Sequence, residues 1–281
     1  MKNQKITNLL TGIPNLFRIQ LAILGMICVL IGGIIGGFEY FDIELILAMI
    51  AVFFITSASM AFNDYFDRDV DKKAHPDRPI PSGKVTPFQG LAISIIFFVI
   101  SLFLSFLINI LCLIIVIISI VLLVLYETIF KNQGIVGNIV VSFIVAISFL
   151  FGGAAIGRPE LALDFTLLAF FIMLGREILM DVTDIEGDKL NRLTLPMRIG
   201  RKKASYIGCF FLFISIFFLF MPGFIGIFPI FYLLLISPVQ IILIYSIILS
   251  VKKIENTGRS ADLLLITFAL GLLVFLISVS I

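Results

Sequence analysis

Two short stretches of the chain each carry three aspartates at the spacing i, i+3 and i+7. They are Asp64, Asp67 and Asp71 in the first stretch and Asp181, Asp184 and Asp188 in the second. At about 100° per residue, the aspartates of one stretch fall within about 60° of one another on a helix. Half of the chain's 18 acidic residues lie in or just before the two stretches. Each stretch is therefore predicted to present a one-sided stripe of carboxylates.

Carboxylates placed this close together repel one another. Two unit charges about 4 Å apart repel by about 4 kcal/mol at an effective dielectric constant of about 20. The stripes therefore persist only if cations join them or if they are protonated. Neither stretch contains a histidine or a cysteine, and oxygen-only ligation suits a hard ion such as Mg²⁺, which also takes substrate phosphates as ligands. The six aspartates therefore predict a Mg²⁺ site that binds a diphosphate.

Composition places these aspartates in a membrane protein. Hydrophobic residues make up 60% of the chain and charged residues 14%, with a mean hydropathy of +1.19, which is typical of an integral membrane protein. We expect a single all-α transmembrane domain over residues 1–281. Its nine predicted spans are 19–37, 43–62, 88–107, 109–126, 136–156, 162–180, 204–221, 225–250 and 261–280. The two aspartate stretches then lie at the ends of the second and sixth spans.

The basic residues indicate which side of the membrane the site faces. If the N-terminus is cytoplasmic, 19 of the 20 lysines and arginines fall on the cytoplasmic side, and only Arg158 falls outside. Both aspartate stretches then face the cytoplasm. Transporters with inverted repeats would place equivalent sites on opposite faces or at the midplane, so this arrangement disfavours that class. We therefore expect a multi-pass protein of the cell membrane with its active site on the cytoplasmic side.

Basic residues beside the stripes are candidates for binding phosphate oxygens. Lys72 and Arg78 lie in the proline-rich segment after the first stretch, and Lys131 is the only basic residue of the loop after the fourth span. An equally simple explanation is that these cations only fix the orientation of the protein in the membrane. Arg176 and Glu177 are charged residues within a predicted span. Such residues are typical of functional sites, although the two charges can also simply pair with others.

Other reactive residue types indicate no second site. The single histidine, His75, has no partner for a metal site and is expected at the surface. Cys28, Cys112 and Cys209 all lie within predicted spans and are expected to be packing residues. The net charge of +2 is concentrated at the predicted inner surface, where it favours anionic headgroups. It gives no reason to expect a nucleic-acid partner.

The two aspartate stretches, the sequence Arg78-Pro79-Ile80-Pro81-Ser82-Gly83 and the nine apolar runs together resemble the UbiA-type intramembrane prenyltransferases. The resemblance covers nearly the whole chain. Within that superfamily, Asn63-Asp64-Tyr65-Phe66-Asp67 and Arg176-Glu177 resemble the archaeal digeranylgeranylglyceryl phosphate synthases most. One departure lies near the first span, where the family's Arg-Pro-x-Asn or Arg-x-x-Asn motif is replaced by Arg18-Ile19-Gln20-Leu21.

This resemblance implies a reaction and assigns roles to residues. It implies a Mg²⁺-dependent enzyme with helices around a central cavity, which transfers a prenyl group, here geranylgeranyl, from an allylic diphosphate donor. The acceptor is expected to be a lipid, geranylgeranylglyceryl phosphate, in ether-lipid synthesis, and the alternative is an aromatic acceptor of quinone or related biosynthesis. The six aspartates are expected to be catalytic and to bind the metal. The residues expected to bind substrate are Asn63, Arg18, Lys72, Arg78, Tyr126, Lys131, Asn138, Arg176 and Lys189.

Two other classes of membrane protein also use acidic residues. A phosphatidyltransferase of the CDP-alcohol type needs Asp-Gly and Ala-Arg elements that this sequence lacks. A divalent-cation transporter is disfavoured because both aspartate stretches are predicted on one side of the membrane and the spans lack acidic residues at their centres. Both classes are therefore weaker interpretations than prenyl transfer.

Overall fold

The chain is built from helices joined by short turns. The computed structural model describes residues 12, 14–37, 42–185 and 192–279, and no strand occurs in these ranges. The long helices are α2 (Ile19–Ile35), α3 (Ile43–Phe66), α5 (Pro87–Ile108), α6 (Ile110–Thr128), α7 (Ile135–Ala155), α8 (Leu163–Thr183), α11 (Arg201–Phe224), α12 (Tyr232–Lys252) and α13 (Thr257–Val279). The short ones are α4 (Arg68–Ala74), α10 (Leu195–Ile199), η1 (Phe130–Asn132), η2 (Pro159–Ala162) and η3 (Ile254–Asn256). The predicted all-α class is confirmed for the described residues.

Seven of the described helices are long and apolar enough to cross a membrane. They are α3, α5, α6, α7, α11, α12 and the segment Ile254–Ser278, which contains most of α13. Helix α2 is apolar but only 17 residues long, and α8 carries several charged residues in its second half. Large apolar side chains are exposed along α5 and α6, such as Phe106 and Ile110, as expected for a surface in contact with lipid. The chain is a multi-pass membrane protein, and the count of nine spans stays a prediction.

The break between α5 and α6 lies at Asn109, where the predicted spans also separate. This residue has an extended backbone, with φ −167° and ψ 170°. Its Oδ1 accepts a hydrogen bond from the amide of Cys112 at 2.8 Å, which caps the first turn of α6. Its Nδ2 donates to the carbonyl oxygen of Ala154 at 2.9 Å and so ties this corner to α7.

The start of α12 differs from the prediction. The predicted span begins at residue 225, whereas α12 begins at Tyr232. Helix α11 ends at Phe224, and the chain then turns through Gly226, which has a φ of +79°. The carbonyl oxygen of Pro229 accepts a hydrogen bond from the amide of Tyr232 at 2.8 Å. Because the residues of this turn are mostly apolar, hydropathy alone does not separate them from the helix.

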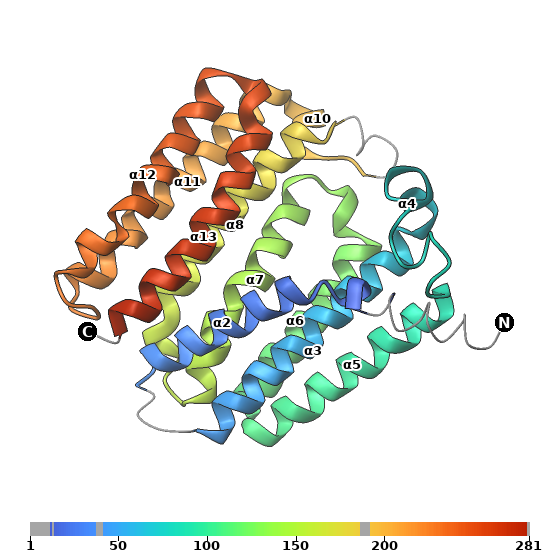
Figure 1. Cartoon of the computed structure of the whole chain (residues 1–281), viewed down its shortest axis with the longest axis horizontal. Helices are drawn as coiled ribbons and strands as arrows, with labels where there is room; N and C mark the ends of the chain where they lie inside the picture. Colours follow the sequence, from blue (N-terminus) through green and yellow to red (C-terminus); the bar gives the residue numbers. More distant parts are fainter. Residues whose placement is uncertain (1–11, 13, 38–41, 186–191, 280–281) are drawn as a thin grey trace.

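Helix α7 lies near the middle of the bundle and contacts α2, α3, α6 and α8 (Figure 1). Its contact with α2 depends on glycine in both helices. A Cβ atom at Gly152 would lie 2.0 Å from the carbonyl oxygen of Val29, and one at Gly32 would lie 2.0 Å from that of Phe149. The backbones therefore approach to a distance that only glycine permits, as the small residues at 152–155 predict.

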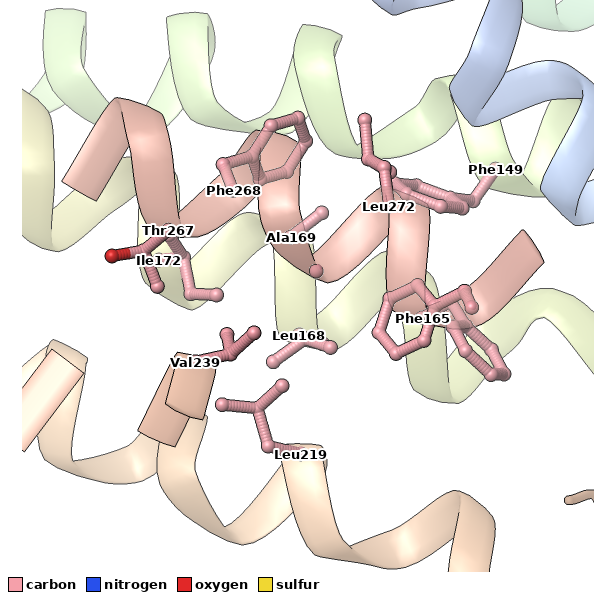
Figure 2. Close-up of a pocket in the computed structure, with 12 residues that line it drawn as sticks. Phe149, Phe165, Leu168, Ala169, Ile172, Leu219, Val239, Thr267, Phe268 and Leu272 are labelled. Carbon is pink, nitrogen blue, oxygen red and sulfur yellow. The ribbon is translucent and has the colours of Figure 1, made fainter. Parts of the chain in front are cut away.

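A second packed region joins α7 and α8 to α11, α12 and α13. Figure 2 shows side chains from these helices around a void of about 10 Å³, among them Phe165 and Leu168 of α8 and Phe268 and Leu272 of α13. The residues that line the void are apolar apart from Thr267 and a glycine. This void is therefore a small gap in the hydrophobic core.

The ends of α3 and α8 that bear the aspartates lie at one end of the bundle. Helix α4 follows α3 directly, and α10 packs against α8. Figure 1 shows α4 and α10 at the same end of the molecule. The described parts of the two aspartate stretches therefore belong to a single region.

Candidate active site

The first aspartate stretch does not lie on one uninterrupted helix, contrary to the prediction. Helix α3 ends at Phe66, and α4 begins at Arg68. Asp67 lies between them with φ −82° and ψ −1°, and its carbonyl oxygen accepts a hydrogen bond from the amide of Asp71 at 2.8 Å. Asp67 contacts Lys131, whereas Asp64 and Asp71 contact arginines.

Asp64 and Asp71 are buried and held by two arginines. Arg18 donates from Nη2 to Oδ1 of Asp64 at 2.8 Å, and Arg78 donates from Nη1 to Oδ2 of Asp71 at 2.5 Å. The same Nη1 of Arg78 lies 3.8 Å from Oδ1 of Asp64. The Asp64 side chain is only 1% exposed. Ionised carboxylates this deeply buried require cationic partners, and the arginines supply them.

Arg18 reaches Asp64 from an unusual backbone conformation. Its φ of 44° and ψ of 58° are in the left-handed region, and it is the only residue other than glycine with positive φ among the described residues. The preceding Leu16 is fully buried in a cluster with Ala61 and Ile80, which anchors this segment against α3 and the loop after α4. Such a conformation costs energy and persists where surrounding contacts fix it, which is common at functional sites.

Asp67 belongs to a separate network on the side of α6. Lys131 in η1 places its Nζ 2.6 Å from Oδ1 of Asp67 and 2.9 Å from Oε2 of Glu127. Asn63 donates from Nδ2 to Oδ2 of Asp67 at 3.1 Å and to Oε1 of Glu127 at 2.8 Å. The lysine and the asparagine thus bridge the same two carboxylates. Sequence reasoning missed Glu127, although its i, i+4 spacing from Lys131 is a signal for such a pair.

The second aspartate stretch contributes Asp181, which is buried near the end of α8. Its Oδ2 accepts a hydrogen bond from Nδ2 of Asn138 at 2.9 Å, and its Oδ1 lies 3.3 Å from Nη2 of Arg192. Asp184 directly follows α8 as its C-cap. Asp188 and Lys189 lie outside the described residues. Arg192 was not singled out from the sequence, where it is one of several basic residues that follow the second stretch.

Lys72 does not join these networks. Its Nζ lies 2.9 Å from Oδ1 of Asp69, and both side chains are about two-thirds exposed. The hydrogen bond from Lys72 lowers the pKa of Asp69 below its usual value. The structure therefore places Lys72 beside Asp69 and away from the described aspartates of the stripe.

A cavity of about 420 Å³ adjoins the charged networks. Most of its lining is apolar and comes from α2, α3, α6, α7, α8 and α13. The polar part of the lining includes Asn63, Tyr126, Glu127, Arg176 and Glu177. Nη1 of Arg176 donates to Oε1 of Glu177 at 2.7 Å. A mostly apolar chamber with charged groups gathered in part of its wall suits an amphiphile with a hydrocarbon tail and a polar head.

A smaller polar pocket lies beside this cavity. Its lining includes Lys131, Asn138, Asp181 and Arg192. Tyr126 and Glu177 border both the pocket and the cavity. Apart from Lys72 and Lys189, every residue expected to bind substrate therefore lies in one of the two networks, at the cavity or in the pocket.

Comparison with known proteins identifies the family. Residues 25–266 match the model of the UbiA prenyltransferase family. This chain belongs to the UbiA prenyltransferase family. The UbiA chain is 35% identical over 251 residues to a digeranylgeranylglyceryl phosphate synthase of Methanopyrus kandleri, covering 89% of this chain and 92% of that one. It is also 35% identical over 270 residues to the synthase of Sulfurisphaera tokodaii, and this match covers 92% of this chain and 96% of that one.

Solved structures place the chain in the same fold. A structure described as digeranylgeranylglyceryl phosphate synthase in membranes has a TM-score of 0.82 and 32% identity, and covers 96% of this chain and 98% of its own. A UbiA homologue from Archaeoglobus fulgidus bound to GPP and Mg²⁺ has a TM-score of 0.71 and 18% identity. The match covers 96% of this chain and 100% of that one. The predicted family resemblance is confirmed, and the chain is a prenyltransferase.

Proposed function

We propose that this UbiA enzyme transfers a geranylgeranyl group from geranylgeranyl diphosphate to the free hydroxyl of geranylgeranylglyceryl phosphate, in ether-lipid synthesis. The observation that carries the proposal is the mostly apolar cavity of about 420 Å³ with charged groups in part of its wall. Two amphiphiles with prenyl tails and phosphate heads match such a chamber. The identity of about 35% to enzymes named for this product, over most of both chains, supports the choice of acceptor.

The cations of the site are proposed to bind the donor diphosphate. Arg18, Arg78 and Lys131 come from three separate segments and contact the aspartates of the first stretch. Guanidinium and ammonium groups form charge-assisted hydrogen bonds with phosphate oxygens. When the diphosphate leaves, these cations and Arg192 stabilise the negative charge that develops on it. Tyr126 and Asn138 are proposed to contact the donor from the polar pocket.

The carboxylates fit a hard metal ion by their chemistry. Asp64, Asp67, Asp71 and Asp181 offer only oxygen atoms, which Mg²⁺ prefers. Each of them is paired with a cation in this structure, and the described residues contain no group of three acidic, histidine or cysteine side chains arranged to hold a metal. We propose that these aspartates, with Asp184 and Asp188, hold Mg²⁺ when the donor binds. The ion would neutralise charge on the diphosphate.

The apolar cavity is proposed to hold the hydrocarbon and to exclude water. Ionisation of an allylic diphosphate leaves an allylic carbocation, which water would capture as an alcohol. The lining of the cavity is dominated by leucine, isoleucine, valine and phenylalanine side chains, with a few hydroxyl groups. Such a lining protects the cation until the acceptor attacks.

The membrane arrangement is part of the proposal. Residues 1–281 are proposed to form one transmembrane domain, in which α2 and α8 cross the membrane together with the seven long apolar helices. The N-terminus and the aspartates would then face the cytoplasm, as the distribution of lysine and arginine indicates.

Product analysis with a panel of acceptors tests the proposed function. Membranes that contain the enzyme are incubated with labelled geranylgeranyl diphosphate and with geranylgeranylglyceryl phosphate, 4-hydroxybenzoate, homogentisate or dihydroxynaphthoate. We expect labelled diether lipid phosphate from the first acceptor and none of the other products. Efficient transfer to an aromatic acceptor, with none to the glyceryl phosphate, would contradict the proposal and favour the aromatic alternative.

A further inference from the structure

Two glutamates border the cavity, and they differ in how their oxygens are held. Glu127 has both oxygens engaged, because Oε1 accepts from Asn63 at 2.8 Å and Oε2 accepts from Lys131 at 2.9 Å. Glu177 accepts from Arg176 on Oε1 at 2.7 Å, and within the described part of the chain its Oε2 has no hydrogen-bond partner. Of the two glutamates, Glu177 is therefore the one with an oxygen available to a substrate.

Glu177 also stands between two chemically different spaces. It lines the mostly apolar cavity, and it lines the polar pocket that contains Lys131, Asp181 and Arg192. In the proposed reaction the diphosphate lies among the cations and the hydrocarbon lies in the cavity. The bond that breaks joins these two parts of the donor. A carboxylate at this boundary is therefore positioned near the carbon that the acceptor attacks.

Two contacts on α8 hold Glu177 in place. Arg176 pairs with it directly, with Nη1 2.7 Å from Oε1 of Glu177. The preceding Gly175 packs closely on α11, because a Cβ atom there would lie 2.6 Å from the side chain of Leu212. Helix α8 is thereby fixed at the turn that carries the pair.

We propose that Glu177 is the general base that takes the proton from the acceptor hydroxyl, an inference that rests on the proposed function. The bond between C1 of the prenyl group and the diphosphate oxygen breaks, and its electron pair leaves with the diphosphate. A lone pair of the acceptor oxygen forms the new bond to C1, and the hydroxyl proton passes to Oε2 of Glu177. The proton then returns to solvent through the polar pocket, which restores the carboxylate.

Carboxylates are weak bases, and a weak base is sufficient here. An alcohol oxygen that bonds to a carbocation becomes strongly acidic as the bond forms, so its proton is easily removed. A positioned general base contributes about 10²- to 10⁴-fold to the rate of such a step. An acceptor with a more acidic reacting group needs this assistance less.

The test compares acceptors of different acidity in the Glu177→Gln enzyme. The first acceptor is geranylgeranylglyceryl phosphate, and the second is the same molecule with a thiol in place of the reacting hydroxyl. We expect transfer to the alcohol to fall by about 10²-fold or more, and transfer to the thiol to fall much less. In the absence of acceptor, water slowly hydrolyses the donor, and the rate of this diphosphate release should stay close to that of the wild-type enzyme. Glu177→Asp should recover part of the transfer to the alcohol.

Control measurements separate the base from other roles. Glu255→Gln changes an exposed glutamate in η3 and should match the wild type in every assay. Equal losses with the alcohol and the thiol, or loss of diphosphate release together with transfer, would overturn the role of Glu177 as a base. Wild-type rates of transfer to the alcohol in Glu177→Gln would overturn it as well. If the wild-type enzyme itself does not use the glyceryl phosphate acceptor, that result contradicts the proposed function, and it is distinguishable from a failure of the general-base role, which only the variants reveal.

Discussion

At the scale of single residues, neighbouring acids in one motif have very different surroundings. Asp67 contacts Lys131 and Asn63 at the polar boundary of the cavity, and its side chain is 22% exposed. Asp69, two positions later, is 68% exposed and pairs with Lys72. A carboxylate in such an exposed and solvated ion pair contributes little to stability or to binding. The chemistry of the motif is therefore expected to depend on Asp67 and not on Asp69.

Replacing Asp67 with asparagine preserves its shape and removes its charge. We expect Asp67→Asn to lower prenyl transfer by about 10²-fold or more, because it removes a preorganised charge from the diphosphate site. Asp69→Asn serves as the matched control and should change the rate by less than about 5-fold. Initial rates with saturating acceptor decide the comparison. A greater loss in Asp69→Asn than in Asp67→Asn would contradict this assignment.

Metal dependence also follows from the types of these residues. Because every proposed ligand is a carboxylate, we expect EDTA to abolish prenyl transfer and added Mg²⁺ to restore it. The measurement is the rate of diphosphate release in purified enzyme before chelation, after chelation and after Mg²⁺ is returned. Undiminished turnover in excess chelator would rule out the proposed role of the aspartates as metal ligands.

At the scale of elements, the sequence predicted the types of the helices better than their ends and contacts. Apolar runs predicted the break at Asn109, where a polar residue interrupts them. They did not predict the turn before Tyr232, because its residues are as apolar as a span. Helical periodicity likewise did not predict the break at Asp67. These boundaries depend on backbone conformations that hydropathy does not encode.

Some residues of the candidate site could be recognised from the sequence, and others could not. Aspartates at repeated spacing and a lone lysine in a loop are recognisable in the sequence, and the structure brings Asp67 and Lys131 together. Glu127 and Arg192 were missed because their contacts depend on which helix ends meet in space. Arg192 contacts Asp181, and it is one of several basic residues that follow the second stretch, so the sequence gives no reason to choose among them.

Close packing of α2 on α7 is the feature at this scale that can be tested directly. We expect Gly152→Ala to destabilise the protein by about 1–3 kcal/mol, because its Cβ would overlap the carbonyl oxygen of Val29. Gly271→Ala in α13 is the control, since its Cβ would only make ordinary contact with Val239 at 3.9 Å. Thermal unfolding in detergent should show a lower midpoint for the first variant only. Equal midpoints would mean that the two helices can separate without cost.

At the scale of the whole molecule, the arrangement of charge determines which side of the membrane holds the chemistry. The described aspartates lie at the ends of α3 and α8 or in α4, and they contact Lys131 and Arg192. Figure 1 shows α4 and α10 at the same end of the bundle. Arg158 lies in the turn between α7 and η2, which connects two long helices at their other ends. A soluble diphosphate reaches the charged end most readily if that end faces the compartment where the donor is made.

Single cysteines at the two ends test this orientation. Arg198→Cys in α10 and Arg158→Cys after α7 both change exposed residues, whereas the native cysteines are buried within helices. In intact cells, a thiol reagent that does not cross membranes should label Arg158→Cys and leave Arg198→Cys unlabelled until the membrane is opened. This result is expected because 19 of the 20 lysines and arginines fall on the predicted inner side. The reverse pattern would invert the topology. Labelling of both variants from outside would mean that an even number of spans separates residues 158 and 198. The nine-span arrangement would then be wrong.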